Sequence, residues 1–112
     1  MQYLVTMDFV DPGPLLATQQ YLGMMRAAVL PGHKALINLK SEGKILAGGY
    51  PVGERAIAFI VDADSPKELD SLLMEIPFWG ITKANVTPLQ EMEDRRDQDR
   101  QAAEQMEQSL QQ

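Results

Sequence analysis

Residues 55–89, RAIAFIVDADSPKELDSLLMEIPFWGITKANVTPL, predict a strand, a helix and a second strand in that order. The first nine residues, 55–63, are apolar at both even and odd positions, which is typical of a strand covered on both faces and predicts a central strand. Ser65 is suited to cap the helix, because a proline follows it and a glutamate comes three residues later. Pro77 ends that helix, and residues 81–89 predict the last strand.

The residues before this stretch predict a strand, a helical segment and another strand. Residues 2–10 alternate with period two, as a strand does, and residues 11–14, DPGP, interrupt it with a turn. Residues 15–42 repeat apolar side chains at three- and four-residue steps, and a glycine follows as a helix stop. Pro31 breaks the pattern, so we expect either one kinked helix or two helices that meet near it. Residues 44–50 predict a strand ending in glycines.

The order strand, helix, strand, strand, helix, strand (βαββαβ) is that of a ferredoxin-like α+β fold. Such a chain forms a four-stranded antiparallel sheet with both helices on one face. The opposite face is then expected to carry apolar residues that nothing else in the chain covers. We therefore expect a homodimer in which two sheets meet as a dimeric α+β barrel, or a higher oligomer built from such dimers.

The charge divides the chain into a domain of residues 1–90 and a C-terminal tail of residues 91–112. The tail holds seven acidic residues and three arginines, a net charge of −4, whereas the domain holds nine acidic and seven basic residues, a net charge of −2. Ala102, Met106 and Leu110 are spaced by four. This spacing predicts either a helix whose narrow apolar stripe docks on a partner subunit or a solvated helix that frays.

Composition excludes several classes of function in this chain of 112 residues. It has no cysteine, which excludes a disulfide scaffold, a thiolate zinc site and a cysteine nucleophile. No cluster of histidines and carboxylates has metal-ligand spacing, so we expect no metal and no cofactor. No basic stripe suits nucleic acid, and no apolar run suits a membrane span. The first residues show no secretory signal, so the expected location is the cytoplasm.

Three segments resemble the muconolactone isomerase-like and YciI-like family of the dimeric α+β barrel superfamily. They are LVTMDF at 4–9, GKILAGGYP at 43–51 and ELDSLLMEIPFWGITKANVTPL at 68–89, and the likeness covers about residues 2–90. The resemblance implies dimers that pack sheet against sheet. It also implies a small cofactor-independent enzyme of the isomerase or cyclase type, which moves a proton on a small lactone or aromatic-derived substrate. The alternative is a non-catalytic ligand-binding or structural oligomer of the same fold.

Three residues are candidates for catalysis. His33 is the only histidine, and imidazole is the side chain that titrates near neutral pH without help. The resemblance implies a histidine in this part of the long helix paired with an aspartate, for which Asp8 or Asp62 is available, and such a pair suits acid–base chemistry. It also implies a catalytic role for Lys34, because the family has a lysine at this place in the long helix. In the family an acidic residue precedes that lysine, whereas this chain has His33 there. The alternatives are a surface histidine, a strand-end carboxylate and a solvated lysine.

Three further residues are candidates for substrate binding. Tyr50 and Arg55 flank the turn between the second and third strands, where an arginine can bind a carboxylate with two parallel hydrogen bonds. Trp79 is placed to wall a planar substrate. The alternatives are a plain hairpin edge for the first two and a packing residue for the tryptophan.

Overall fold

The computed structural model describes residues 1–10 and 17–111, and its elements follow the predicted order. They are β1 (Gln2–Phe9), α1 (Thr18–Met24), the π-helical η1 (Met25–Val29), α2 (Leu30–Ser41), β2 (Ile45–Gly49), β3 (Ala56–Asp62), α3 (Pro66–Met74), the 3-10 turn η2 (Trp79–Ile81), β4 (Thr82–Leu89) and α4 (Met92–Leu110). The predicted turn at residues 11–14 lies outside the described residues.

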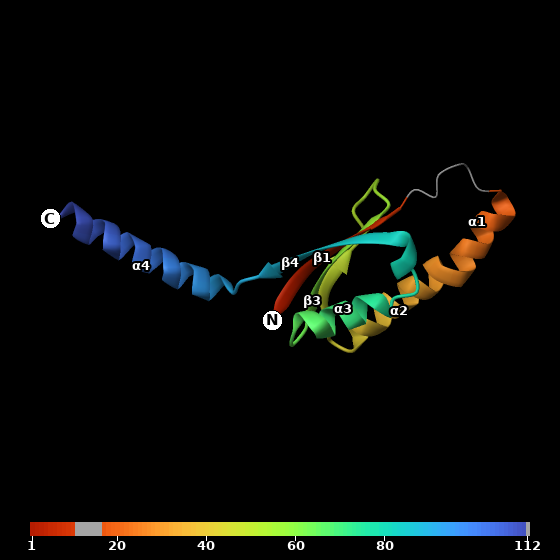
Figure 1. Cartoon of the computed structure of the whole chain (residues 1–112), viewed down its shortest axis with the longest axis horizontal. Helices are drawn as coiled ribbons and strands as arrows, with labels where there is room; N and C mark the ends of the chain where they lie inside the picture. Colours follow the sequence, from red (N-terminus) through yellow and green to blue (C-terminus); the bar gives the residue numbers. More distant parts are fainter. Residues whose placement is uncertain (11–16, 112) are drawn as a thin grey trace.

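The four strands form one antiparallel sheet in the order β2-β3-β1-β4. The strand predicted to be central, β3, lies between β2 and β1. In Figure 1, α2 and α3 lie together on one side of this sheet. The arrangement confirms the predicted ferredoxin-like α+β fold.

The hydrophobic core fills the space between the sheet and these helices. Alternate residues of β1 and β3 point into it, so that Val5, Met7 and Val61 are fully buried. Helix α3 adds Leu69 and Leu73 on one face, as the three- and four-residue spacing of its leucines requires. The period-two pattern of the strands therefore decides which side chains the helices cover.

The long helical segment is continuous from α1 through η1 to α2, and its irregular turn comes just before Pro31. The amide of Leu30 bonds to the carbonyl of Met25, five residues earlier, as in a π-helix. In a regular α-helix, a proline ring clashes with the carbonyl four residues before it. The wider π-helical turn, Met25–Val29, includes this position for Pro31. Both expectations for Pro31 are thus met in part: the helix does not break, but its hydrogen bonding changes one turn earlier.

Helix ends lie where their capping residues predict them. The Ser65 hydroxyl accepts a hydrogen bond from the Glu68 amide at 3.1 Å and so caps α3. Gly43 follows the end of α2 with φ of 80°, and its amide bonds to the Lys40 carbonyl at 3.1 Å. The amide of Lys44 bonds to the Leu39 carbonyl at 3.0 Å, which completes a Schellman motif.

The opposite face of the sheet carries a mixture of apolar and polar residues. Leu4 and Ile60 are partly buried there, beside Thr6, and the cross-strand partner of Thr6 is Asn85. Among the described residues, no helix covers this face. The expected apolar residues are therefore present on this face, and β1 and β4 add threonine and asparagine side chains to it.

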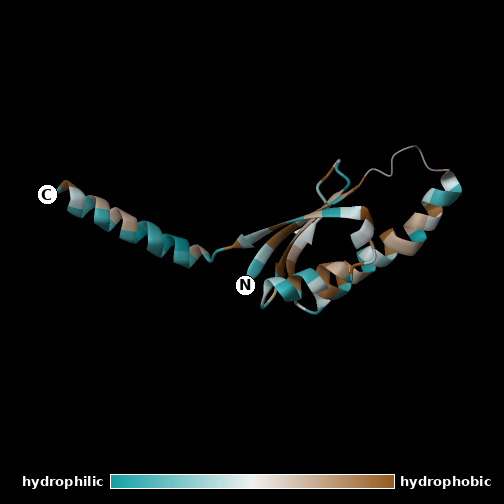
Figure 2. Ribbon diagram, viewed as in Figure 1, coloured by the Kyte–Doolittle hydropathy of each residue, from teal (hydrophilic) through white to brown (hydrophobic). Residues whose placement is uncertain are grey.

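Helix α4 confirms that the tail is helical, and it leads away from the rest of the molecule (Figure 1). None of its residues is buried, and Met106 and Leu110 are 66% and 87% exposed. Figure 2 shows it as mostly hydrophilic, with a few apolar side chains. In the part of the chain that the structure describes, no helix combines the length and apolarity needed to cross a membrane.

A glycine in α2 sets how closely this helix approaches the loop after α3. A Cβ on Gly32 would collide with the ring of Phe78, which is fully buried. We expect Gly32→Ala to lower the free energy of unfolding by about 1–3 kcal/mol, because the ring has no free space to move into.

The matched control is Gly23→Ala in α1, where an added Cβ meets nothing within 4 Å. This substitution should leave stability unchanged or raise it by up to about 1 kcal/mol, because alanine is the better helix former. Urea denaturation of both variants measures the difference. Equal stability of the two variants would contradict the close contact.

Candidate functional site

His33 and Tyr50 form a hydrogen-bonded pair. The Nδ1 atom of His33 lies 2.7 Å from the Tyr50 hydroxyl, and the two rings meet edge to face with centroids 5.2 Å apart. Helix α2 supplies the histidine one turn after its start, and Tyr50 is the first residue after β2. The ring of Phe78 packs on the imidazole at a centroid distance of 6.0 Å. The only histidine of the chain is therefore held by one polar and one apolar neighbour.

This pair is suited to both halves of a proton transfer. Burial raises the pKa of the Tyr50 phenol above its ordinary value, so Tyr50 keeps its proton at neutral pH. When Nδ1 of His33 carries a proton, it donates to the phenol oxygen and Nε2 is free to accept a proton. In the other tautomer, the phenol donates to Nδ1 and Nε2 carries the proton. Tyr50 can thus orient the imidazole in either state.

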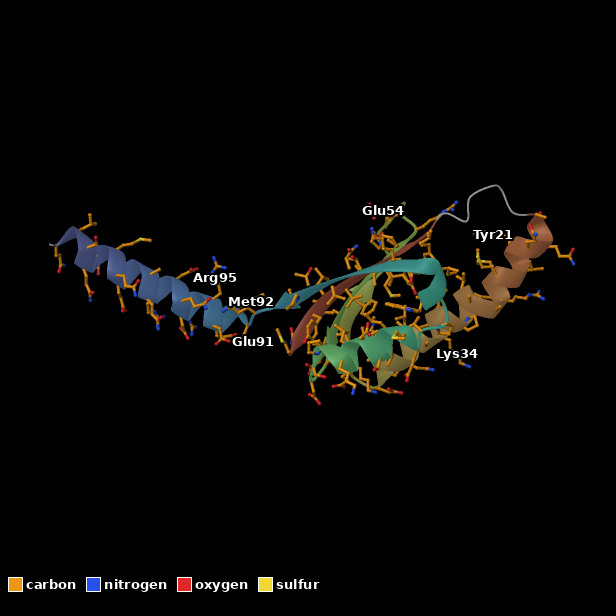
Figure 3. The ribbon with its side chains drawn as sticks, in the orientation of Figure 1. Tyr21, Lys34, Glu54, Glu91, Met92 and Arg95 are labelled. Carbon is orange, nitrogen blue, oxygen red and sulfur yellow. The ribbon has the colours of Figure 1, made fainter. Side chains whose placement is uncertain are left out.

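Tyr50 lines an open groove of about 390 Å³. Helix α1 and η1 form one wall, and the end of β1, the β2–β3 turn and η2 form the other. Its lining is mostly apolar, with Tyr21 on the helical wall and Glu54 and Arg55 on the turn. Figure 3 shows Tyr21 on α1 and Glu54 at the tip of the β2–β3 turn. The groove is suited to a small, largely apolar molecule with an anionic group for Arg55.

A second cavity of about 140 Å³, which we call the inner pocket, lies between α2 and the strands β2 and β3. Tyr50 lines both the groove and the inner pocket. Lys40 is the charged residue among the residues that line the inner pocket. Tyr50 therefore contacts both cavities, whereas His33, its hydrogen-bond partner, is in the lining of neither.

The predicted pairing of His33 with an aspartate is not found. Asp8 is exposed on the sheet face opposite the helices, because Met7 and Phe9 on either side of it point to the core. Asp62 instead forms an ion pair with the N-terminal amine at 3.0 Å. Tyr50 takes the place expected for the aspartate.

The other predicted site residues fall into two groups. Arg55 and Tyr50 line the groove as expected for residues at a pocket mouth. Trp79 is partly buried and packs against the core, next to groove residue Gly80, but does not itself line the groove. Lys34 is exposed and lines neither cavity, and Figure 3 shows it on the side of α2 away from the sheet.

Sequence reasoning missed two residues of the cavities, Lys40 and Tyr21. Lys40 follows the buried Leu36 by four residues, and this spacing places both on one face of the helix. Tyr21 belongs to the repeat of apolar residues in the predicted helix, without a sign that it faces a groove. Among the described residues, no three histidine, aspartate or glutamate side chains gather as a metal site would require.

Comparison with known proteins links this chain to one family. The family model described as muconolactone delta-isomerase matches residues 1–95. A crystal structure of muconolactone isomerase superposes with a TM-score of 0.66 at 19% identity, covering 81% of this chain and 90% of that chain. The 5-chloro-2-hydroxyhydroquinone dehydrochlorinase of Burkholderia phenoliruptrix AC1100, in complex with 2,5-dihydroxybenzoquinone, superposes with a TM-score of 0.57 at 23% identity. Here 84% of this chain and 98% of that chain are covered. No curated protein sequence matches significantly.

The raised pKa of Tyr50 has a consequence at alkaline pH. The neutral phenol contributes stability that is fully present below its ordinary pKa of about 10 and is lost as the pH rises through the higher pKa of the folded state. In a pH titration, the unmodified protein should show one phenolate absorbance more than Tyr50→Phe. We expect this additional absorbance to appear above pH 10. The unfolding free energy of the unmodified protein should also fall more steeply than that of Tyr50→Phe above this pH. A difference titration centred at or below pH 10 would contradict the raised pKa of Tyr50.

Proposed function

This chain belongs to the muconolactone delta-isomerase family, and we propose that it is a cofactor-independent enzyme that moves a proton within a small lactone or aromatic-derived substrate. The hydrogen bond of 2.7 Å between His33 and Tyr50 carries the proposal, because it joins the only histidine to a tyrosine that lines the groove. The superposed structures support the fold on which this pair is built.

The proposed reaction begins with removal of a proton from a carbon beside a carbonyl group. His33 accepts the proton at Nε2 while Nδ1–H donates to the Tyr50 oxygen. The electron pair of the broken C–H bond moves onto the carbonyl oxygen as the double bond shifts. The imidazolium of His33 then returns the proton to another carbon, so that atoms and charge balance over the cycle.

Binding in this proposal rests on Arg55 and the apolar lining of the groove. A carboxylate of the substrate forms charge-assisted hydrogen bonds with the guanidinium group, which fix the position of the ring. Tyr21 and the methionines of η1 and α1 supply apolar surface on the other side. The proposed roles are acid–base catalysis for His33, positioning of the imidazole for Tyr50 and substrate binding for Arg55.

The proposal predicts different kinetic effects for the histidine and the arginine. With muconolactone as the first substrate tested and 5-chloro-2-hydroxyhydroquinone as the second, His33→Gln should lower kcat about 100-fold or more, because it removes the proton carrier. Arg55→Met should mainly raise KM, by about tenfold, because it removes a charged hydrogen-bond donor. Steady-state rates are measured by ultraviolet absorbance.

Lys67→Gln is the control, because Lys67 is an exposed lysine at the start of α3 and lies outside both cavities. It should leave both constants unchanged. Turnover by His33→Gln at the unmodified rate would refute the catalytic role. Binding of both compounds without turnover by the unmodified protein would favour the non-catalytic alternative.

We also propose that the protein forms a homodimer through the face of the sheet that the helices do not cover. Partly buried Leu4 and Ile60 on this face support the proposal, because a second sheet would remove them from water. The polar residues beside them, Thr6 and Asn85, suit an interface that also carries hydrogen bonds.

This assembly predicts that Ile60→Lys shifts the protein from dimer to monomer without unfolding it, because Ile60 lies outside the core. Met74→Lys is the matched control, since Met74 is an exposed apolar residue of α3 on the other side of the molecule. Sedimentation velocity measures the mass of each variant. A monomeric unmodified protein, or an Ile60→Lys variant that stays dimeric, would contradict this interface.

A further inference from the structure

The inner pocket is an apolar cavity that shares Tyr50 with the groove. Its walls are apolar, with Leu36 and Ile37 from α2 opposite Ile57 and Phe59 from β3. Tyr50, whose hydroxyl holds His33, forms part of its lining. A molecule that fills this pocket therefore contacts the same tyrosine as a molecule in the groove.

Lys40 gives the inner pocket a positive charge with no carboxylate to neutralise it. Among the described residues, Lys40 forms no ion pair, whereas Lys44 lies 3.8 Å from Glu42. The lining of the inner pocket contains no acidic residue. An ammonium group beside an apolar surface is suited to an organic anion, whose charge it pairs with and whose carbon atoms the surface covers.

We propose that the inner pocket is a second subsite, and that the protein prefers a substrate with two anionic groups, one for Arg55 and one for Lys40. This inference rests on the proposed function, since it names the substrate class of the same site. The reacting carbon then lies beside the His33–Tyr50 pair, between the two cations. The two positive charges stand out because the domain as a whole is acidic, with a net charge of −2 over residues 1–90.

The dimensions of α2 agree with a small substrate of this kind. His33 and Lys40 are two helical turns apart, which is about 10 Å along the helix axis. This spacing accommodates one ring with a short acidic arm. Lys34, the neighbour of His33, lines neither cavity, so the lysine of this helix that can reach a bound anion is Lys40.

The test compares two probes of similar shape on the full-length protein. Benzoate carries one carboxylate and isophthalate carries two. Isothermal titration should give isophthalate about tenfold higher affinity than benzoate. Lys40→Met should remove this preference, whereas Lys34→Met, the same substitution on the same helix, should retain it. Arg55→Met should lower the affinity for both probes.

A second variant tests the pocket without changing its charge. An added Cβ on Gly49 meets nothing within 4 Å, so Gly49→Val places a larger side chain in the lining without a backbone clash. This substitution should lower the affinity for isophthalate and leave the affinity for benzoate unchanged. Circular dichroism and thermal melting of each variant confirm that it is folded before its affinities are compared.

Equal affinity of the unmodified protein for both probes, or no binding of isophthalate, would overturn the second subsite. Lys40→Met and Lys34→Met variants with the same preference would overturn it as well. These readouts are binding constants, so they are independent of turnover. The kinetics of His33→Gln decide the proposed function separately, and either proposal can fail while the other stands.

Discussion

The close contact between Gly32 and Phe78 is the constraint on which the rest of the structure depends. The ring of Phe78 is fully buried and occupies the space that any side chain at position 32 would need. The same ring meets Phe9 of β1 edge to face, with centroids 5.1 Å apart, and packs on His33. One aromatic side chain therefore joins the loop after α3 to the sheet and to the long helix. It also fixes the imidazole, because His33 follows Gly32 directly.

The arrangement of the site follows from this contact. With α2 held close to the loop after α3, His33 faces the end of β2, where Tyr50 meets it at 2.7 Å. Tyr50 lines both cavities, and Arg55 lines the groove whereas Lys40 lines the inner pocket. The catalytic proposal and the second subsite thus use the same pair of rings. The second subsite adds Lys40 to Arg55, which the catalytic proposal already uses to bind the substrate.

The site shows where reasoning from the sequence reached its limit. His33 was identified because a single histidine in a chain without cysteine is the obvious proton carrier. Its partner was sought among aspartates, but the alternation of β1 sends Asp8 to the other face of the sheet, and this alternation was already visible in the sequence. Tyr50 lies 17 residues from His33. Their contact depends on how far α2 runs before the chain turns into β2, which no local pattern specifies.

The sequence by itself determined the order of the elements, their approximate ends and, for β1, which residues share a face. Caps, glycine stops and the periods of 2 and 3.6 residues are local properties, so they can be read from neighbouring residues. Only the tertiary structure decided that the turn before Pro31 is π-helical, that Tyr50 holds His33, and that Lys40 rather than Lys34 lines a cavity. The last two depend on the distance between elements far apart in the chain. That distance is set by packing, above all by the space that Gly32 leaves for Phe78.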